Sequence, residues 1–195
     1  MELNKIKKAA LEEIKNPTLE LTKQYLSVNR LIAEDGFPVI EDVIVDEKRE
    51  IASVYFPIAE EDYFFVVYVN YRARMEIKAT GTTPGTRVYF SAKSDTHQVD
   101  ELIKIIDFEP TKKWDKGESR GKNIESIYSF SAFYYEKNLN RTGELEYKLS
   151  ELVDFLLARK EKIKALTEIA ELVIQVAYYG YKEQLWGIHL DKDLI

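Results

Sequence analysis

The chain contains only two histidines and no cysteine, so it offers few imidazoles and no thiol for acid–base, nucleophilic or metal chemistry. A histidine-based acid/base pair or a Ser/His/Asp triad would have to use His97 or His189. His97 lies among Asp95, Thr96 and Asp100, and His189 precedes two further aspartates, which is a loose arrangement for a carboxylate metal site. The chain also lacks a glycine-rich phosphate loop. The simpler interpretation is a loop histidine and a strand-end histidine, so we expect no catalytic residues, no metal and no cofactor.

A tryptophan stands in a polar segment that proline and glycine bound. Trp114 lies within residues 109–122, where a large aromatic ring is uncommon because it normally seeks burial and a partner for its indole N–H. The favoured interpretation is structural: the ring folds back as a lid against the end of a helix that contains Ile103 and Ile106. The neighbouring lysines would then extend into water.

The same segment has a functional interpretation. Trp114 with Lys112, Lys116 and Arg120 could form an aromatic and basic platform for a phosphate, a nucleotide or an acidic peptide. The patch of cations is modest and includes two carboxylates, well short of the basic stripe that nucleic-acid binding requires. We therefore do not expect a nucleic-acid partner.

Negative charge is concentrated in one part of the chain, although the net charge of the whole is only -6. Residues 34–62 contain ten acidic residues against two basic ones. Such a stretch is usually a set of solvated turns and strand edges, but it could also attract a basic intracellular protein. The acidic residues that we select as candidate partner-binding residues are Glu41, Asp42, Glu60, Glu61 and Asp62.

The composition is that of a globular protein, with 195 residues, 45% hydrophobic and 32% charged. Without cysteine the chain gains nothing from an oxidising compartment, so a cytoplasmic location is expected. No signal-peptide pattern and no apolar stretch of membrane-spanning length is present, so no membrane association is expected. The 13 tyrosines fit either a half-buried sheet or a protein interface.

In the N-terminal half, apolar residues at helical spacing predict two helices separated by Asn16-Pro17, the second of which reaches Ile32. Strand-like alternation from residue 40 onward predicts an antiparallel meander. In its last strand, Met75, Ile77 and Ala79 are expected on the buried face. The meander is expected to end in a type II turn over residues 83–86, Thr-Pro-Gly-Thr.

In the C-terminal half, Val88 and Phe90 are expected to be buried together on a central strand at residues 87–93. Asp95 or Thr96 is expected to cap a short helix whose apolar face includes Val99 and Leu102. A polar connection, an aromatic strand and a long helical region with a break near residue 159 follow. The elements expected after the connection are residues 127–136 (strand), 145–169 (helical), 172–179 (strand) and 184–190 (strand).

Several of these patterns together resemble the family called domain of unknown function 4279. They are Val88-Tyr89-Phe90-Ser91, Glu109-Pro110-Thr111 followed by Trp114 and Lys116-Gly117, and Gly187-Ile188-His189-Leu190. The resemblance covers roughly residues 87–195, and the Pro-Thr-x-x-Trp-x-Lys-Gly string is its most specific part. It implies a bacterial protein with an α+β fold and supplies no catalytic or binding residue.

The expected fold class is α+β, with N-terminal helices, an antiparallel meander, and a β-α-β-α-β-β half that shares or abuts the same sheet. Residues 1–84 form an N-terminal extension and residues 85–195 the domain that resembles the family, the two packing as one compact body. The expected function is a non-catalytic protein-binding role, immunity-type or regulatory. The alternative is a small-ligand or phosphate-binding protein, or a weak enzyme, that uses the Trp114 loop.

Overall fold

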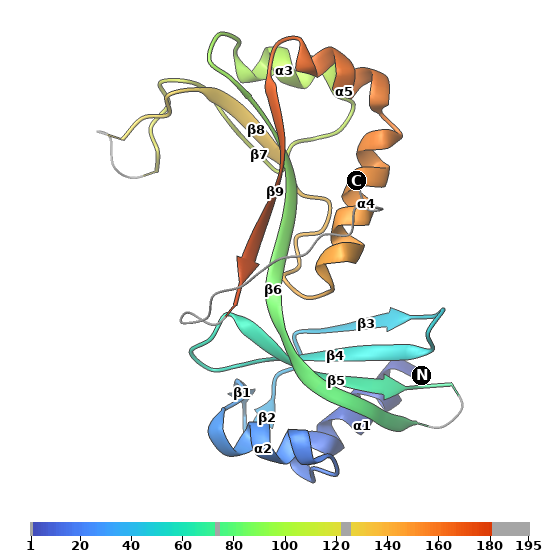
Figure 1. The fold of residues 1–195 in the computed structure, drawn as a ribbon. Coiled ribbons are helices and arrows are strands. Elements are labelled where there is room, and N and C mark those ends of the chain that lie inside the picture. Colours follow the sequence, from blue (N-terminus) through green and yellow to red (C-terminus); the bar gives the residue numbers. More distant parts are fainter. Residues whose placement is uncertain (1, 73–74, 122–125, 181–195) are drawn as a thin grey trace. The chain divides into compact units, whose positions relative to one another are not determined.

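The computed structural model describes residues 2–72, 75–121 and 126–180 (Figure 1). The described residues fall into two compact units: unit 1 contains residues 2–85 and 178–180, and unit 2 contains residues 86–177. The long strand β6 (Glu76–Ser94) contributes its first half to unit 1 and its second half to unit 2. The expected α+β fold class is confirmed.

Unit 1 is an antiparallel meander with two N-terminal helices and a small hairpin. Its sheet has the order β3-β4-β5-β6, and every neighbouring pair is antiparallel. Its elements are α1 (Glu2–Lys15), α2 (Glu20–Val28), the hairpin β1 (Ala33–Glu34) and β2 (Phe37–Pro38), then β3 (Asp42–Asp46), β4 (Ile51–Pro57), β5 (Tyr63–Asn70) and the first half of β6.

Helix α1 covers β4 and β5 because its apolar residues recur at helical spacing. Ile6 and Ala10 are buried in one cluster with Phe56 and Phe65 of the two central strands. Tyr25 of α2 stacks on Phe65 at 4.6 Å between ring centroids. Helix α2 ends at Val28, so the expected extension to Ile32 is wrong, and Ile32 instead donates its N–H to Pro57.

Glu13 joins the two helices of unit 1 although its side chain is buried. Its carboxylate accepts hydrogen bonds from the Thr18 N–H at 3.0 Å, the Thr18 hydroxyl at 2.6 Å and the Leu19 N–H at 3.1 Å. Burial alone would raise the pKa of Glu13, but these bonds, with one from Thr22, together lower it below the ordinary value of 4.5. A charged carboxylate therefore closes the turn between α1 and α2.

The expected turn at residues 83–86 is wrong, because β6 continues through it as extended strand. Pro84 pairs with Tyr63, and the Gly85 N–H donates to the Asp62 carbonyl at 3.3 Å. Proline cannot donate to a β-ladder and is tolerated best where pairing ends. Tyr63 is the first residue of β5, so Pro84 stands at the end of that ladder.

A β-bulge in β6 reverses the expected alternation. Ala79 pairs with Tyr68, but the next pair joins Ile77 to Val69, which leaves Lys78 as an extra residue. An extra residue moves the side chains on one side of it to the other face. Thr80 is therefore buried, and Ala79, which was expected to be buried, is exposed. Ile77 packs against the unit 1 core as expected, whereas Met75, which precedes β6, is exposed and was wrongly expected to be buried.

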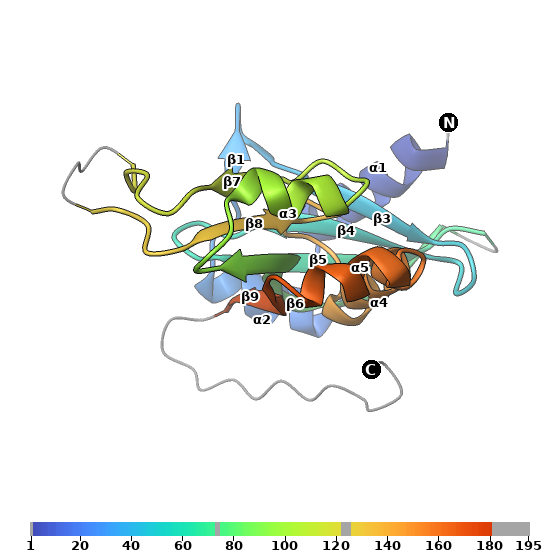
Figure 2. The same cartoon turned by 90° about the horizontal axis from the view of Figure 1, so that it is seen from above.

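Unit 2 is a sheet with helices packed on one face. Strand β6 pairs with β8 and also with β9, and β7 is the strand at the far side of β8. Its elements are the second half of β6, then α3 (Val99–Ile105), β7 (Lys112–Trp114), β8 (Ser131–Tyr135), α4 (Leu145–Leu157), α5 (Lys160–Thr167) and β9 (Glu171–Tyr179). Figure 2 shows α3 lying over β8.

The core of unit 2 lies between the sheet and its helices. Val88 and Phe90 are buried together, as expected, and they share a cluster with Phe133 of β8, Leu102 of α3 and Leu152 of α4. The expected break near residue 159 is confirmed, because α4 ends at Leu157 and α5 begins at Lys160. The strand expected at residues 184–190 lies outside the described residues.

Helix α3 is capped by a residue that is distant in the sequence. Neither Asp95 nor Thr96 supplies the expected side-chain cap. Instead the Asp115 carboxylate accepts the Val99 N–H at 2.7 Å. A carboxylate at this position satisfies one of the free N–H groups of the first turn. Among the helices that the structure describes, none is long and apolar enough to cross a membrane.

Candidate functional site

The two faces of the unit 2 sheet differ in chemistry. Phe90 and Phe133 face the helices and belong to the core. Side chains alternate along a strand, so their neighbours Tyr89 and Tyr134 lie on the opposite face, with ring centroids 5.3 Å apart. This second face carries most of the partly exposed aromatic side chains of β6, β7 and β8.

Trp114 is the last residue of the edge strand β7, and its side chain lies on this second face. Its ring stacks on Tyr128 at 4.9 Å with an interplanar angle of 24°, and Phe130 and Tyr134 flank it at 6.3 and 6.4 Å. The expectation that Trp114 packs against the end of the helix with Ile103 and Ile106 is wrong. We call the residues Tyr89, Trp114, Tyr128, Phe130 and Tyr134 the aromatic row.

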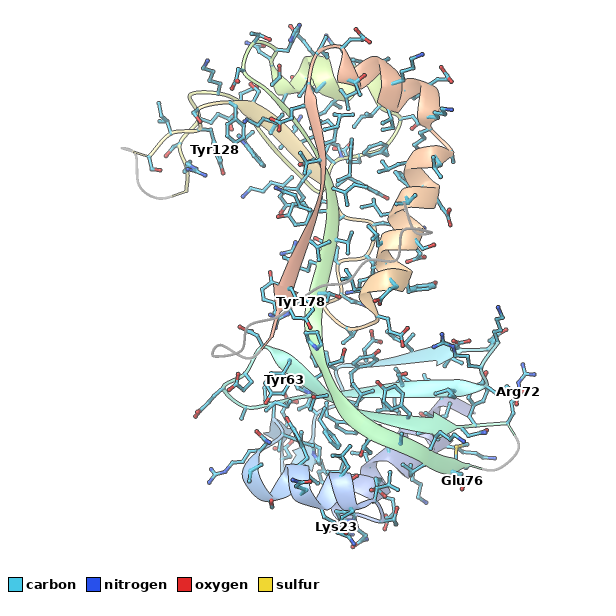
Figure 3. The ribbon with its side chains drawn as sticks, in the orientation of Figure 1. Lys23, Tyr63, Arg72, Glu76, Tyr128 and Tyr178 are labelled. Atoms are coloured by element: carbon cyan, nitrogen blue, oxygen red, sulfur yellow. The ribbon has the colours of Figure 1, made fainter. Side chains whose placement is uncertain are left out.

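Tyr128 is positioned by two paired arms that continue from β7 and β8 (Figure 3). The Gly117 N–H donates to the Tyr128 carbonyl at 2.8 Å, and the Tyr128 N–H donates to Glu118 at 2.9 Å. Farther along, the Arg120 N–H donates to Ser126 at 2.6 Å. Gly117 has a backbone φ of 89°, a conformation that residues other than glycine rarely adopt. The backbone, more than side-chain packing, therefore sets Tyr128 beside Trp114.

Three cations lie over rings of the aromatic row. The Lys112 ammonium is 5.9 Å from the Trp114 ring centroid, the Arg120 guanidinium is 5.1 Å from that of Tyr128, and the Lys93 ammonium is 4.7 Å from that of Phe130. Such contacts contribute about 0.5–1 kcal/mol each when exposed. They also hold long, mobile side chains in place.

The cations differ in what else they contact. Lys93 pairs with Glu171 at 3.6 Å, and Lys113, which points to the helix side, pairs with Asp100 of α3 at 3.1 Å. Lys112 and Arg120 form no ion pair within the described part of the chain. They are therefore the two cations of this face whose charge is not already matched by a carboxylate.

The four candidate residues of the tryptophan segment do not converge on a single point. Trp114, Lys112 and Arg120 lie along the aromatic row, as described above. The Lys116 ammonium instead donates to the backbone carbonyl of Asp95 at 3.2 Å, which draws it toward the end of β6. The indole N–H of Trp114 is buried and has no partner among the described residues.

The acidic stretch of residues 34–62 is divided over different parts of unit 1. Asp46 and Glu50, at the turn between β3 and β4, pair with Arg49 and Arg72. The five acidic candidates lie at the other end of the meander. Asp42, the first residue of β3, pairs with Tyr55 near the end of β4, and Glu41 precedes it. The other three candidates lie in the turn from β4 to β5. These five residues are Glu41, Asp42, Glu60, Glu61 and Asp62.

His97 lies near Ser94, but the pair is not arranged for nucleophilic catalysis. The Ser94 hydroxyl donates to the Ile169 carbonyl at 2.8 Å and accepts the His97 N–H at 3.2 Å. The His97 Nδ1 atom lies 3.0 Å from the Thr96 hydroxyl and 3.4 Å from that of Ser94. An activated serine would donate its proton to the imidazole. Here the serine hydroxyl instead donates to the Ile169 carbonyl, and this hydrogen bond links the end of β6 to the segment that precedes β9.

A shallow hollow of about 320 Å³ lies beside Ser94, lined also by Asp95, Thr96, Thr167 and Glu171. The described residues contain no group of three or more histidine, aspartate or glutamate side chains that could hold a metal ion. His189 lies outside the described residues.

Apart from Trp114, sequence reasoning selected none of the aromatic row as site residues, and it missed Tyr89, Tyr128, Phe130 and Tyr134. A signal for the last three exists, because Tyr128, Phe130 and Tyr134 share the even-numbered parity of one strand face. Without the pairing of the two arms, however, nothing in the sequence relates that face to Trp114.

Residues 84–195 match the model of the family described as Domain of unknown function (DUF4279). The match covers more than half of the chain, so the protein belongs to this family, and the expected resemblance is confirmed. It includes unit 2 and the whole aromatic row. No curated protein matches the chain. No solved structure matches it.

Proposed function

We propose that this protein is a non-catalytic binding protein, and that its DUF4279 part takes an anionic partner on the aromatic row. The observation that carries the proposal is the position of Lys112 and Arg120, each over an aromatic ring and neither matched by a described carboxylate. A guanidinium stacked on a ring keeps its in-plane N–H donors available for an oxyanion. Aromatic residues and arginine are also enriched at protein interfaces.

The role that fits this surface is an immunity-type or regulatory one in the cytoplasm, in which the protein occupies a partner without transforming it. The hydrogen bonds of Ser94 and His97 support a structural function for both residues. The aromatic row, by contrast, combines ordered backbone with two available charges. Binding thus requires no reacting group.

Fluorescence of Trp114 tests the proposal. Trp186 is the only other tryptophan, so Trp186→Phe leaves Trp114 as the single reporter. In that background, poly-L-glutamate should change the emission saturably, and raised salt should weaken binding because exposed charges are screened. Lys112→Ala/Arg120→Ala should reduce the affinity by about tenfold or more, which corresponds to about 1.4 kcal/mol.

The matched control is Lys160→Ala/Lys164→Ala, which removes the same charge from exposed positions of α5. Binding by this control should remain within about twofold of the parent if the contacts are specific, because distant surface charges act weakly. An absence of binding by the parent, or an equal loss in both double variants, would disprove the proposal.

The acidic end of the unit 1 meander supports a second candidate, the binding of a basic intracellular protein. The supporting observation is that the fold gathers five acidic residues there, whereas Asp46, Glu47 and Glu50 lie at the opposite end, at the turn from β3 to β4. Poly-L-lysine is a suitable probe: Glu41→Gln/Glu60→Gln should weaken its binding at low salt. The control Glu47→Gln/Glu50→Gln removes two charges from the opposite turn of the same meander, and an equal effect of the two double variants would reject this candidate.

A further inference from the structure

Within the aromatic row, the stacked pair of Trp114 and Tyr128 lies in a line between the two available cations. Lys112 pairs with Tyr134, and Trp114 pairs with Ala132. Farther along the same two arms, Tyr128 is bonded to Gly117 and Glu118, and Arg120 to Ser126. The order along the line is therefore Lys112, Trp114, Tyr128, Arg120.

The length of this line sets the size of the ligand. The Lys112 ammonium lies 5.9 Å from the Trp114 ring centroid, the two stacked rings are 4.9 Å apart, and the Arg120 guanidinium lies 5.1 Å from the Tyr128 ring centroid. These distances add to about 16 Å, which is the largest separation that the two cations can have. The oxygens of one phosphate or one carboxylate lie only about 2–3 Å apart, and the stacked pair of Trp114 and Tyr128 lies between the two cations, so a single small anion does not bridge both. A ligand that uses both cations must be extended and must carry several negative charges.

The faces of the rings distinguish between the two kinds of extended anion. Single-stranded nucleic acid binds such surfaces by stacking bases on open aromatic faces. In this row Trp114 and Tyr128 cover each other, and Lys112, Arg120 and Lys93 lie over rings. A base would have to displace a cation or separate the stacked pair. A carboxylate side chain needs only the N–H donors of the cations.

The charges around the aromatic row also favour a peptide over a nucleic acid. Glu118 lies between Lys112 and Arg120 along the arm, and the whole chain carries a net charge of -6. A nucleic-acid backbone has a negative charge at every nucleotide, so one of its phosphates would lie close to the Glu118 carboxylate. A peptide can place its acidic residues at the cations and neutral residues between them.

We propose that the partner of the aromatic row is an extended acidic peptide segment of another protein, which lies along the two arms with its carboxylates at Lys112 and Arg120. This inference rests on the function proposed above and specifies its ligand. At about 3.3 Å per residue, about five residues in extended form are enough for the segment to reach both cations. Its affinity should depend on both ends of the line.

Four probes in the Trp186→Phe background test the inference: a glutamate-rich peptide of about ten residues, one of about three residues, an oligo-dT of about ten nucleotides, and inorganic phosphate. The long peptide should bind at least about tenfold more tightly than the short one or phosphate, and more tightly than oligo-dT. Lys112→Ala and Arg120→Ala should each lower its affinity by about threefold to tenfold, whereas Lys160→Ala should not.

Each other outcome overturns a defined claim. If oligo-dT binds more tightly than the long peptide, the peptide inference fails while binding at the aromatic row stands. If phosphate or the short peptide equals the long peptide, the site is a point site and the extended ligand is wrong. If no probe changes the fluorescence and calorimetry shows no heat of binding, the proposed function fails together with the inference.

Discussion

The carboxylate of Glu13 offers a direct test of how unit 1 is stabilised. Glu13→Gln keeps the size of the side chain but removes its charge and replaces one acceptor oxygen by an NH₂ group. The carboxylate accepts two bonds from Thr18 and one from Leu19, and hydrogen bonds to a charged group contribute about 1.5–3 kcal/mol each. Since glutamine retains one acceptor, we expect the free energy of unfolding to fall by about 2–4 kcal/mol at pH 7.

The same residue predicts a pH dependence with a definite sign. The folded-state pKa of Glu13 lies below its ordinary value of 4.5, so the ionised form is favoured by folding. Its stabilisation is complete above that ordinary value and is lost as the pH falls through the lower folded-state pKa. The stability difference between the wild type and Glu13→Gln should therefore narrow progressively below about pH 4.5.

Urea unfolding followed by circular dichroism at pH 7, 5, 4 and 3 measures both effects. Glu12→Gln is the matched control, because Glu12 is exposed and its carboxylate accepts one bond, from the Asn16 amide at 2.6 Å. The control should change stability by no more than about 0.5 kcal/mol. A loss below about 1 kcal/mol in Glu13→Gln, or a difference that stays constant down to pH 3, would refute the assigned role of Glu13.

Three further changes test unit 2 by chemical unfolding. Phe90→Ala should lower the free energy of unfolding by about 3–5 kcal/mol, because it empties a buried site of the core, and a loss near zero would contradict the central position of β6. Asp115→Ala should cost about 1 kcal/mol by removing the cap of α3, with Asp115→Asn retaining most of the stability. Trp114→Ala should cost about 2 kcal/mol, between a surface change and a full core truncation, because the ring is half-buried; an unchanged stability would show that its stacking on Tyr128 contributes nothing.

Local sequence patterns predicted correctly those features of the fold that depend on residues close together in the chain. Helical spacing placed α1 and the break between α4 and α5, and alternation placed Val88 and Phe90 together in the core. These features depend on side chains within a few residues of one another. The family resemblance to DUF4279 was also visible in short strings of residues.

The failures share a physical cause, because each depends on pairing with a distant segment. The local sequence around Pro84 favours a turn, but Pro84 pairs with Tyr63 at the end of the β5–β6 ladder and so stays in the strand. The bulge at Lys78 follows from the register with β5, which the alternation of β6 alone cannot show. Likewise Trp114 contacts Tyr128 because the two arms pair, so the sequence indicated Trp114, Lys112 and Arg120 but not the aromatic residues beside them.

Charge reversal at the ends of the aromatic row is the most direct test of the account. In the Trp186→Phe background, Lys112→Glu/Arg120→Glu replaces the two available cations with carboxylates and leaves the Trp114–Tyr128 stack in place. Circular dichroism and urea unfolding should first show that the variant is folded. The account predicts that this variant loses binding of the acidic peptide of about ten residues and gains binding of a lysine-rich peptide of the same length. Retained binding of the acidic peptide by the folded variant would contradict it.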